Sequence, residues 1–239
     1  MLCILETQIA KTRVENLRYT LGFDNCFAVA SSGRSGGLGV FWNNNVMVKV
    51  NHFSQYHIDA EFAEPEKDKW RLTFMYGEAK RNLRHRTWEL MKFMRGESDL
   101  PWLCMGDFNE ILRREEQFGA NDREEYLMEG FREAVDVCGL CDIGYRGLDW
   151  TWEKKVSGGN YVRVRLDRAL ATSNWCNLFP FAKLRHLAAV KSDHCPILLS
   201  TEQADDSRRI HSRGRPFRYE IMWETHKTLI PMVESFWKR

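Results

Sequence analysis

The stretch Pro101-Trp102-Leu103-Cys104-Met105-Gly106-Asp107-Phe108-Asn109 decides the fold that we expect for this chain. Its apolar residues behind a proline predict a short buried strand that ends at Gly106, where the polarity changes. Asp107 and Asn109 follow that strand, and residues two apart on an extended chain share a face. The pattern therefore places a carboxylate and an amide in the same space, which suits activating a water molecule and stabilising an anion.

A second stretch near the end of the chain, Ser192-Asp193-His194-Cys195-Pro196, carries a histidine beside a carboxylate. The apolar run Ile197-Leu198-Leu199 follows it and predicts a strand. Either stretch alone could be a turn, and Gly-Asp at a strand end is more often a turn than a site. The presence of both in one chain favours a functional site.

Composition indicates a folded domain without a membrane span. The 239 residues are 44% hydrophobic and include nine tryptophans, which is enough for a sizeable core. No apolar run has the length of a membrane-crossing helix, and the N-terminus lacks a signal-peptide pattern. Seven scattered cysteines favour reduced thiols in an intracellular protein. The formal net charge of +2 neither requires a nucleic-acid partner nor excludes an enzyme that contacts a few phosphates.

Short strands and a few helices alternate along the first two hundred residues. Strands are expected at residues 1–5, 26–30, 37–42, 46–53, 57–62, 70–76, 101–105, 140–143, 151–155, 161–166, 183–188 and 196–200. Helices are expected before Gly22 and at about 82–95, 123–138 and 174–179, with a charged loop at 113–122. Alternation in the 161–166 strand predicts that Arg163 and Arg165 lie on its exposed face. Hairpins mixed with helices predict an α+β sandwich.

The composition changes after residue 201. Residues 202–215 are polar and predict a linker, and 217–237 are aromatic and partly helical but too short to fold alone. We therefore expect a main domain at residues 1–201 and, at 202–239, a linker with the start of a connector to a further domain.

Polar groups that suit metal-assisted hydrolysis occur at the expected strand ends. They are Glu6, Asp107 with Asn109, Asp167, and Asp193 with His194. Carboxylates that meet at one edge of a sheet can hold a hard cation such as Mg²⁺. A histidine beside them can hydrogen-bond a phosphoryl oxygen or move a proton near neutral pH. Any one aspartate is as readily a turn residue, but the set together predicts phosphodiester hydrolysis.

At these residues the chain resembles the endonuclease/exonuclease/phosphatase superfamily, whose fold is the DNase-I-like four-layer α/β sandwich. The matching motifs are Leu5-Glu6-Thr7, Tyr76-Gly77, Gly106-Asp107-Phe108-Asn109, Arg165-Leu166-Asp167-Arg168 and Ser192-Asp193-His194-Cys195-Pro196. Within the superfamily, the likeness is greatest to the endonuclease domain of plant LINE-type (non-LTR) retrotransposons. It rests on Gly36-Gly37-Leu38 before Val40-Phe41-Trp42, on Asp107-Phe108-Asn109-Glu110-Ile111, on Thr151-Trp152, and on Arg215-Pro216-Phe217-Arg218-Tyr219 with Trp223.

The resemblance implies a catalytic role for five residues. Asp107 would orient or deprotonate the attacking water, and Asn109 would hold Asp107 and the phosphate. Asp167 would fix the ring of His194, whose other nitrogen would face the scissile phosphate. Tyr76 would also donate a hydrogen bond to the phosphate.

The resemblance also implies a cofactor and a partner. Glu6 would bind Mg²⁺ or Mn²⁺, with Asp193 near the metal or hydrogen-bonded around it. The expected substrate is DNA and the expected location is the nucleus, with no membrane and no small-molecule cofactor; the oligomeric state is open.

One feature departs from the family pattern. Family members begin with a strand whose asparagine helps to bind the metal, and this chain starts at the next strand, so we expect an N-terminally truncated sandwich. Three readings stay open from the sequence: a metal-dependent DNA endonuclease, complete or decayed; a non-catalytic remnant that folds or binds without cutting; and a phosphatase of the same fold. Whether Met1 is the true start also stays open.

Overall fold

A mixed six-stranded sheet forms the centre of the structure. The computed structural model describes residues 1–32, 35–63, 68–119, 123–189 and 191–202. The strand order in this sheet is β4-β5-β6-β7-β12-β9. The strands are β4 (Met47–Ser54), β5 (His57–Ala63), β6 (Trp70–Tyr76), β7 (Trp102–Asp107), β12 (Asp167–Thr172) and β9 (Leu140–Asp142).

Within this sheet, β6 and β7 are parallel, and the other neighbouring pairs are antiparallel. Helix α2 (His85–Gly96) connects the two parallel strands after a short 3-10 turn at Arg81–Leu83. Because β6 and β7 run in the same direction, they end at the same edge, where the antiparallel β12 begins.

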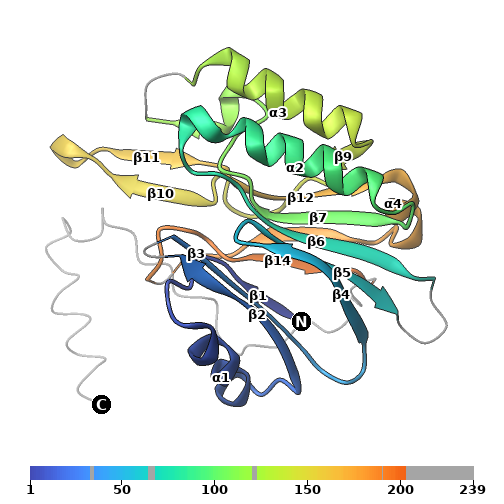
Figure 1. Cartoon of the computed structure of the whole chain (residues 1–239). Helices are drawn as coiled ribbons and strands as arrows, with labels where there is room; N and C mark the ends of the chain where they lie inside the picture. Colours follow the sequence, from blue (N-terminus) through green and yellow to red (C-terminus); the bar gives the residue numbers. More distant parts are fainter. Residues whose placement is uncertain (33–34, 64–67, 120–122, 190, 203–239) are drawn as a thin grey trace, which may run out of the picture. The chain divides into compact units, whose positions relative to one another are not determined.

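A second layer of strands packs on one face of the six-stranded sheet. It consists of β1 (Leu2–Ile4), β3 (Ser35–Trp42) and β2 (Asn25–Ser32) in the order β1-β3-β2, and of the hairpin β13 (Lys183–His186) and β14 (Ile197–Ser200). Leu38 and Val40 of β3 and Leu184 of β13 share one core cluster with Leu72 of β6 and Leu103 of β7. Helix α1 (Lys11–Leu21) covers the outer side of the β1-β3-β2 sheet, with Val14 buried against it (Figure 1).

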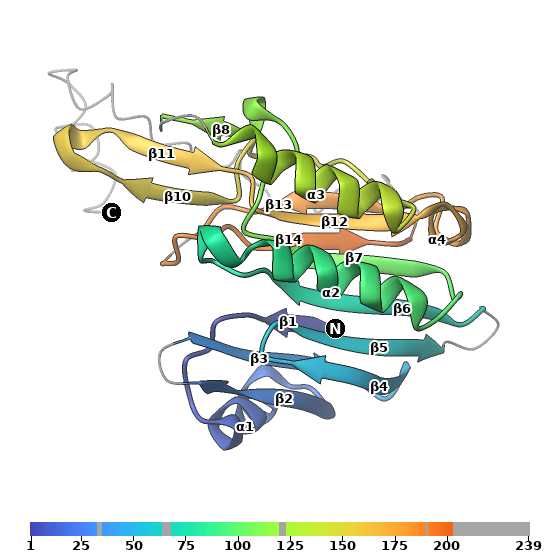
Figure 2. The ribbon, with the colours of Figure 1, turned by 45° about the horizontal axis from the view of Figure 1, so that its top comes forward.

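Helices α2 and α3 (Glu125–Val137) cover the opposite face of the six-stranded sheet (Figure 2). Met91 and Phe131 from these helices are fully buried in one cluster with Trp102 and Leu170 of the sheet. The layers therefore follow the order helix, sheet, sheet, helices, which confirms the predicted α+β DNase-I-like sandwich.

A further small sheet extends from the end of the sandwich at which β6 and β7 terminate. It has the order β10-β11-β8, with β10 (Trp152–Lys155), β11 (Tyr161–Val164) and β8 (Gln117–Phe118). Figures 1 and 2 both show β10 and β11 projecting beyond the central strands. The remaining elements are helix α4 (Ser173–Leu178) and 3-10 turns at Arg114–Glu116 and Ser157–Gly159.

Two local expectations were wrong. The charged loop expected at 113–122 contains a 3-10 turn and strand β8. Arg165, expected on an exposed strand face, lies beyond the end of β11 and is buried.

Several expectations are not decided by the fold. The linker and connector expected at 202–239 lie, apart from residue 202, outside the described residues. In the part of the chain that the structure describes, no helix is both long and apolar enough to cross a membrane. All seven cysteines belong to that part, where they are free thiols.

Candidate active site

The strand register brings three of the predicted site residues to one edge of the six-stranded sheet. Tyr76 at the end of β6 lies opposite Asp107 at the end of β7, and Asp107 lies opposite Asp167 at the start of β12. All three side chains are buried. Gly106 has a φ of 144°, and a Cβ there would lie 2.1 Å from the Met75 carbonyl oxygen. Glycine is therefore required for β6 and β7 to approach this closely in front of Asp107.

Asn109 forms a closed turn with Asp107. Its backbone N–H donates to Asp107 Oδ1 at 2.7 Å, and its Nδ2 donates to Asp107 Oδ2 at 3.0 Å and to the Gly77 carbonyl at 2.9 Å. Asn109 has a φ of 54°, a left-handed conformation that asparagine tolerates better than most residues. The amide thus holds both oxygens of Asp107 and ties the β7 loop to the β6 loop.

His194 lies between the two buried aspartates. Its Nδ1 bonds Asp167 Oδ2 at 2.8 Å, and its Nε2 lies 4.0 Å from Asp107 Oδ2. Thr151, which is fully buried, accepts the backbone N–H of Asp167 at 2.8 Å on its hydroxyl, and its carbonyl accepts the N–H of Cys195. Thr151 therefore connects the strand of Asp167 to the segment of His194, a role that we did not predict from the sequence.

Asp107 and His194, which face each other at 4.0 Å, both have a raised pKa and so both favour the protonated form. Burial, reinforced by the negative charge of Asp167, raises the pKa of Asp107 to about 7. Burial alone would lower the pKa of His194, but the hydrogen bond and charge of Asp167 outweigh it and raise that pKa to about 9. The site therefore pairs a carboxylate that can take up a proton near neutral pH with an imidazolium that stays protonated at that pH.

Glu6 reaches the same site from a different sheet. It follows β1 with a φ of 52°, is exposed, and accepts a hydrogen bond from the hydroxyl of Tyr76. Burial and this bond raise the pKa of the Tyr76 hydroxyl well above its usual range, so Tyr76 stays a donor.

Asp193 is exposed and accepts a hydrogen bond of 3.0 Å from the indole N–H of Trp152, the first residue of β10. Glu6, Asp107, Asp167, Asp193 and His194 all line one cavity of about 1070 Å³. The structure thus gathers the predicted polar groups around one space. Among the described residues, however, no group of three or more His, Cys, Asp or Glu side chains is arranged to hold a metal ion.

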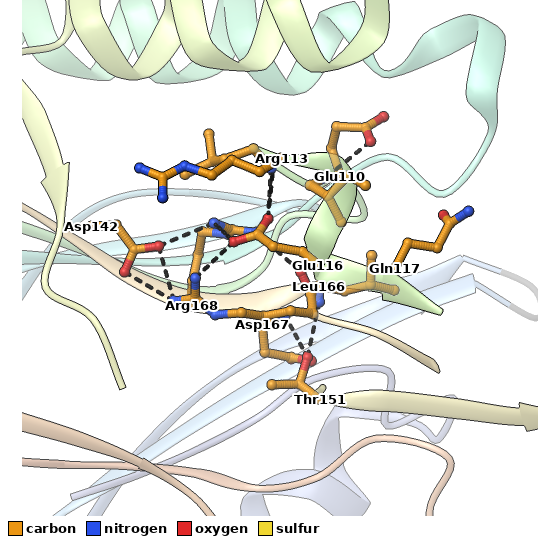
Figure 3. Close-up of polar contacts among 12 residues, drawn as sticks. Glu110, Arg113, Glu116, Gln117, Asp142, Thr151, Leu166, Asp167 and Arg168 are labelled. Carbon is orange, nitrogen blue, oxygen red and sulfur yellow. Dashed lines mark hydrogen bonds and ion pairs between the residues drawn. The ribbon is translucent and has the colours of Figure 1, made fainter. Parts of the chain in front are cut away.

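A buried charge network supports the segment that carries Asp167 (Figure 3). Arg165 bonds Glu116 and Asp142, each within 3.0 Å, and Arg168 bonds the same two carboxylates. These two arginines flank Asp167 and anchor it to β9 and to the turn before β8. We did not predict the roles of Glu116 and Asp142 from the sequence, because Glu116 lies in the stretch expected to be a charged loop and Asp142 in a short expected strand. No spacing relates either residue to residues 165–168.

A second buried carboxylate supports the Asn109 turn. Glu110 is fully buried and pairs with Arg84 at 2.6 Å and with Arg123 at 3.1 Å. Arg123 also donates to the Asn109 carbonyl at 3.2 Å. The backbone N–H and the carbonyl of Asn109 are thus both hydrogen-bonded, which fixes its left-handed conformation.

Comparison with known proteins identifies the fold. No family model matches the sequence, and no curated protein matches it. Among solved structures, the endonuclease domain of TRAS1, a telomere-specific non-LTR retrotransposon, has 12% identity and a TM-score of 0.60, over 83% of this chain and 97% of that one. The 3′ phosphatase NExo from Neisseria, bound to a product DNA hairpin, has 15% identity and a TM-score of 0.64, over 84% and 88%. An AP endonuclease from Archaeoglobus fulgidus has 16% identity and a TM-score of 0.63, over 83% and 87%.

These neighbours are DNase-I-like proteins of the endonuclease/exonuclease/phosphatase superfamily, and this chain has their fold. The predicted resemblance is confirmed at that level. The finer likeness to plant LINE elements stays a prediction from the sequence motifs.

Proposed function

We propose that the chain is a metal-dependent phosphodiesterase that cuts DNA, of the kind found in non-LTR retrotransposons. The observation that carries the proposal is the line Asp167–His194–Asp107, with a 2.8 Å bond on one side of the imidazole and a 4.0 Å gap on the other. Neighbours of the same fold include two endonucleases and a 3′ phosphatase, which supports phosphoester hydrolysis as the class of reaction.

The site offers a base and a donor for this reaction. Asp107, with its pKa raised to about 7, takes a proton from water as the water oxygen attacks phosphorus. His194 Nε2–H donates to the phosphoryl oxygen on which negative charge develops, while Asp167 holds the ring from Nδ1. The P–O bond opposite the water then breaks, and the departing oxygen takes a proton from solvent, to which Asp107 returns the proton that it accepted. Asn109 keeps Asp107 in place through the turn described above.

The residues present suit a Mg²⁺ or Mn²⁺ ion with a largely aqueous coordination shell. Mg²⁺ commonly uses only one or two protein carboxylates and keeps several waters. Glu6 is an exposed carboxylate that lines the cavity and would hold the ion, and Asp193 lines the same cavity. When bound, the ion would polarise the phosphate and neutralise its charge.

The β10–β11 hairpin suits a long polyanion better than a small phosphate. It starts at Trp152, which bonds Asp193, and carries the exposed Lys154 and Lys155 away from the site. On β11, the guanidinium of Arg163 lies 4.1 Å from the ring centre of Trp150. A basic hairpin beside the cavity would contact DNA phosphates next to the cut, and chromosomal DNA as substrate would place the protein in the nucleus.

The test is nicking of supercoiled plasmid in Mg²⁺ by the full chain and by the Asp107→Ala and His194→Ala variants. Loss of a water-activating or phosphate-facing group commonly costs about a hundredfold or more in rate. We expect both variants to lose nicking, and Asp99→Ala, at a fully exposed carboxylate, to keep it. Undiminished nicking by either site variant would remove that residue from the proposed mechanism.

A 3′-phosphorylated DNA hairpin, assayed in parallel, distinguishes a phosphatase from an endonuclease. Release of phosphate without nicking would replace the endonuclease proposal by a phosphatase that uses the same site. Absence of both activities in the presence of Mg²⁺ and Mn²⁺ would favour a domain that binds without cutting.

A further inference from the structure

The segment that carries Asp193 and His194 is bound along its backbone to the start of the β10–β11 hairpin. The N–H of Glu153 donates to the Asp193 carbonyl at 2.9 Å, and Trp152 and His194 form an antiparallel β-bridge. These backbone contacts place Trp152, the first residue of β10, directly beside two residues of the candidate site.

Trp152 is itself held in place by the small sheet and by the core beneath it. It pairs with Val164 of β11 in the register of the hairpin. Its side chain packs on a buried cluster that consists of Ile111, Met128, Val164 and Leu166. A ring packed in this way loses little further freedom when its N–H forms a hydrogen bond, so the indole is a rigid donor.

Asp193, in contrast, is an exposed residue with little to hold its side chain. In the part of the chain that the structure describes, its carboxylate accepts a single hydrogen bond, from Trp152 Nε1 to Oδ2 at 3.0 Å. The other oxygen, Oδ1, has no hydrogen-bond partner there. An exposed carboxylate samples several rotamers unless a partner holds it, so the bond from Trp152 fixes its orientation.

A fixed orientation of Asp193 matters for a metal ion in the cavity. Asp193 and Glu6 line the same cavity, where a Mg²⁺ or Mn²⁺ ion would bind in the proposed reaction. Mg²⁺ keeps several of its waters, so a second carboxylate assists either by direct contact or by accepting hydrogen bonds from those waters. Groups that orient such carboxylates commonly account for about ten- to hundredfold in metal affinity.

We propose that Trp152 is a positioning residue for this metal site: its indole N–H holds Oδ2 of Asp193 and leaves Oδ1 for the ion or its bound waters. Trp152 acts through Asp193 and needs no contact of its own with the ion or the substrate. One side chain thereby joins the hairpin proposed to contact DNA to a carboxylate of the metal site. The part played by the ion rests on the proposed function, whereas the hold of Trp152 on Asp193 does not.

The test compares Trp152→Phe with Trp150→Phe in the full chain. Phenylalanine keeps an aromatic ring on the buried cluster and removes the N–H. Trp150 is the matched control, because it lies two residues away and its ring packs on the guanidinium of Arg163 at 4.1 Å. Binding of Mn²⁺ in the absence of DNA is followed by the electron paramagnetic resonance signal of the free ion. We expect Trp152→Phe to weaken Mn²⁺ binding about tenfold and Trp150→Phe to leave it within about twofold.

A double-mutant cycle with Asp193→Ala separates positioning from general damage to the fold. If Trp152 acts through Asp193, Trp152→Phe has no further effect on Mn²⁺ binding once Asp193→Ala is present. If Trp152→Phe does not melt cooperatively, the NMR signal of the Trp152 indole N–H decides. Asp193→Ala should shift this signal and speed its exchange with solvent, and an unchanged signal would contradict the hydrogen bond.

Three results of the Mn²⁺ titrations would overturn the proposal. They are equal losses in Trp152→Phe and Trp150→Phe, fully additive losses in the double mutant, and no Mn²⁺ binding by the unmodified chain. Nicking is measured separately. A chain that binds Mn²⁺ in the expected order without cutting DNA contradicts the proposed function alone, whereas nicking with unchanged Mn²⁺ binding in Trp152→Phe contradicts the role of Trp152 alone.

Discussion

Replacing Asp167 by asparagine should lower the pKa of His194, and the size of the change follows from one contact. His194 Nδ1 lies 2.8 Å from Asp167 Oδ2, and both side chains are largely buried, at 26% and 10% exposed. A hydrogen bond between charged groups contributes about 1.5–3 kcal/mol, and one pKa unit corresponds to about 1.4 kcal/mol. We therefore expect the pKa of His194 to fall from about 9 by roughly one to two. The variant keeps the side-chain shape and the backbone bond to Thr151, so the fold should persist.

The measurement is an NMR titration of the histidine ring signals in the full chain and in Asp167→Asn. Asp193→Asn is the matched control, because Asp193 adjoins His194 in sequence and contributes less to its pKa. The control should therefore lower the pKa less than Asp167→Asn does. If His194 titrates within a few tenths of a unit of its original pKa in Asp167→Asn, the assignment of Asp167 as its partner is wrong. A fall in the control equal to that in Asp167→Asn would contradict it as well.

The same contact predicts how stability depends on pH. The folded-state pKa of His194, about 9, lies above the value of about 6.5 expected in the unfolded chain. The folded chain therefore holds an extra proton between these values. This contribution to stability is complete below pH 6.5 and is lost as the pH rises through 9. In Asp167→Asn the loss should be smaller, as urea unfolding at pH 6.5 and pH 9 would show.

Three further changes test other parts of the structure. Burial lowers the pKa of His57 to about 4 in the folded chain. As the pH falls below 6.5, His57 is therefore protonated in the unfolded chain before it is protonated in the folded chain, which favours unfolding. His57→Phe should therefore reduce the loss of unfolding free energy between pH 6.5 and 5 by up to about 2 kcal/mol, whereas His85→Phe at an exposed position should not. Gly106→Ala should cost at least about 2 kcal/mol in denaturant unfolding, since its Cβ would overlap a carbonyl, whereas Gly96→Ala, with open space, should stay within about 1 kcal/mol of the unmodified chain. Arg168→Met leaves two partly buried carboxylates short of a partner and should cost about 3 kcal/mol or more; a cost below about 1 kcal/mol would show that the network contributes little.

The sequence was informative where side-chain periodicity and burial coincide. Strand β7 appears as an apolar run that ends at a glycine, and helix α3 has a full apolar face from Leu127 to Val135. The polar residues at strand ends were predictable for the same reason. A carboxylate directly after a buried apolar run is expected at the edge of the sheet, where the strand ends. Asp107, Asp167 and His194 lie together as expected.

Contacts between distant charged segments were not predictable. Arg165 follows the alternation of an exposed strand face, yet its side chain is 5% exposed, because it pairs with Glu116 and Asp142. Local periodicity assigns a charged residue to solvent unless a partner is known, and these partners are 49 and 23 residues away. Trp152 shows a related limit: the sequence gives it only as part of the motif Thr151-Trp152, and its half-buried indole bonds the exposed Asp193, 41 residues away.

The arrangement of the site explains why a buried network lies behind it. Asp107 and Asp167 are opposite each other across paired strands, and two buried carboxylates at this separation repel each other. His194 offsets part of that repulsion through its bond to Asp167, and burial together with the remaining repulsion raises the pKa of Asp107. Holding this unfavourable pair requires a rigid backbone on both sides. Arg165 and Arg168 fix the strand of Asp167, while Arg123 and Glu110 fix the turn after Asp107. The position of Asp107 beside Asp167, which contributes to its raised pKa, is thus fixed by ion pairs. The residues of these ion pairs do not line the cavity of the proposed reaction.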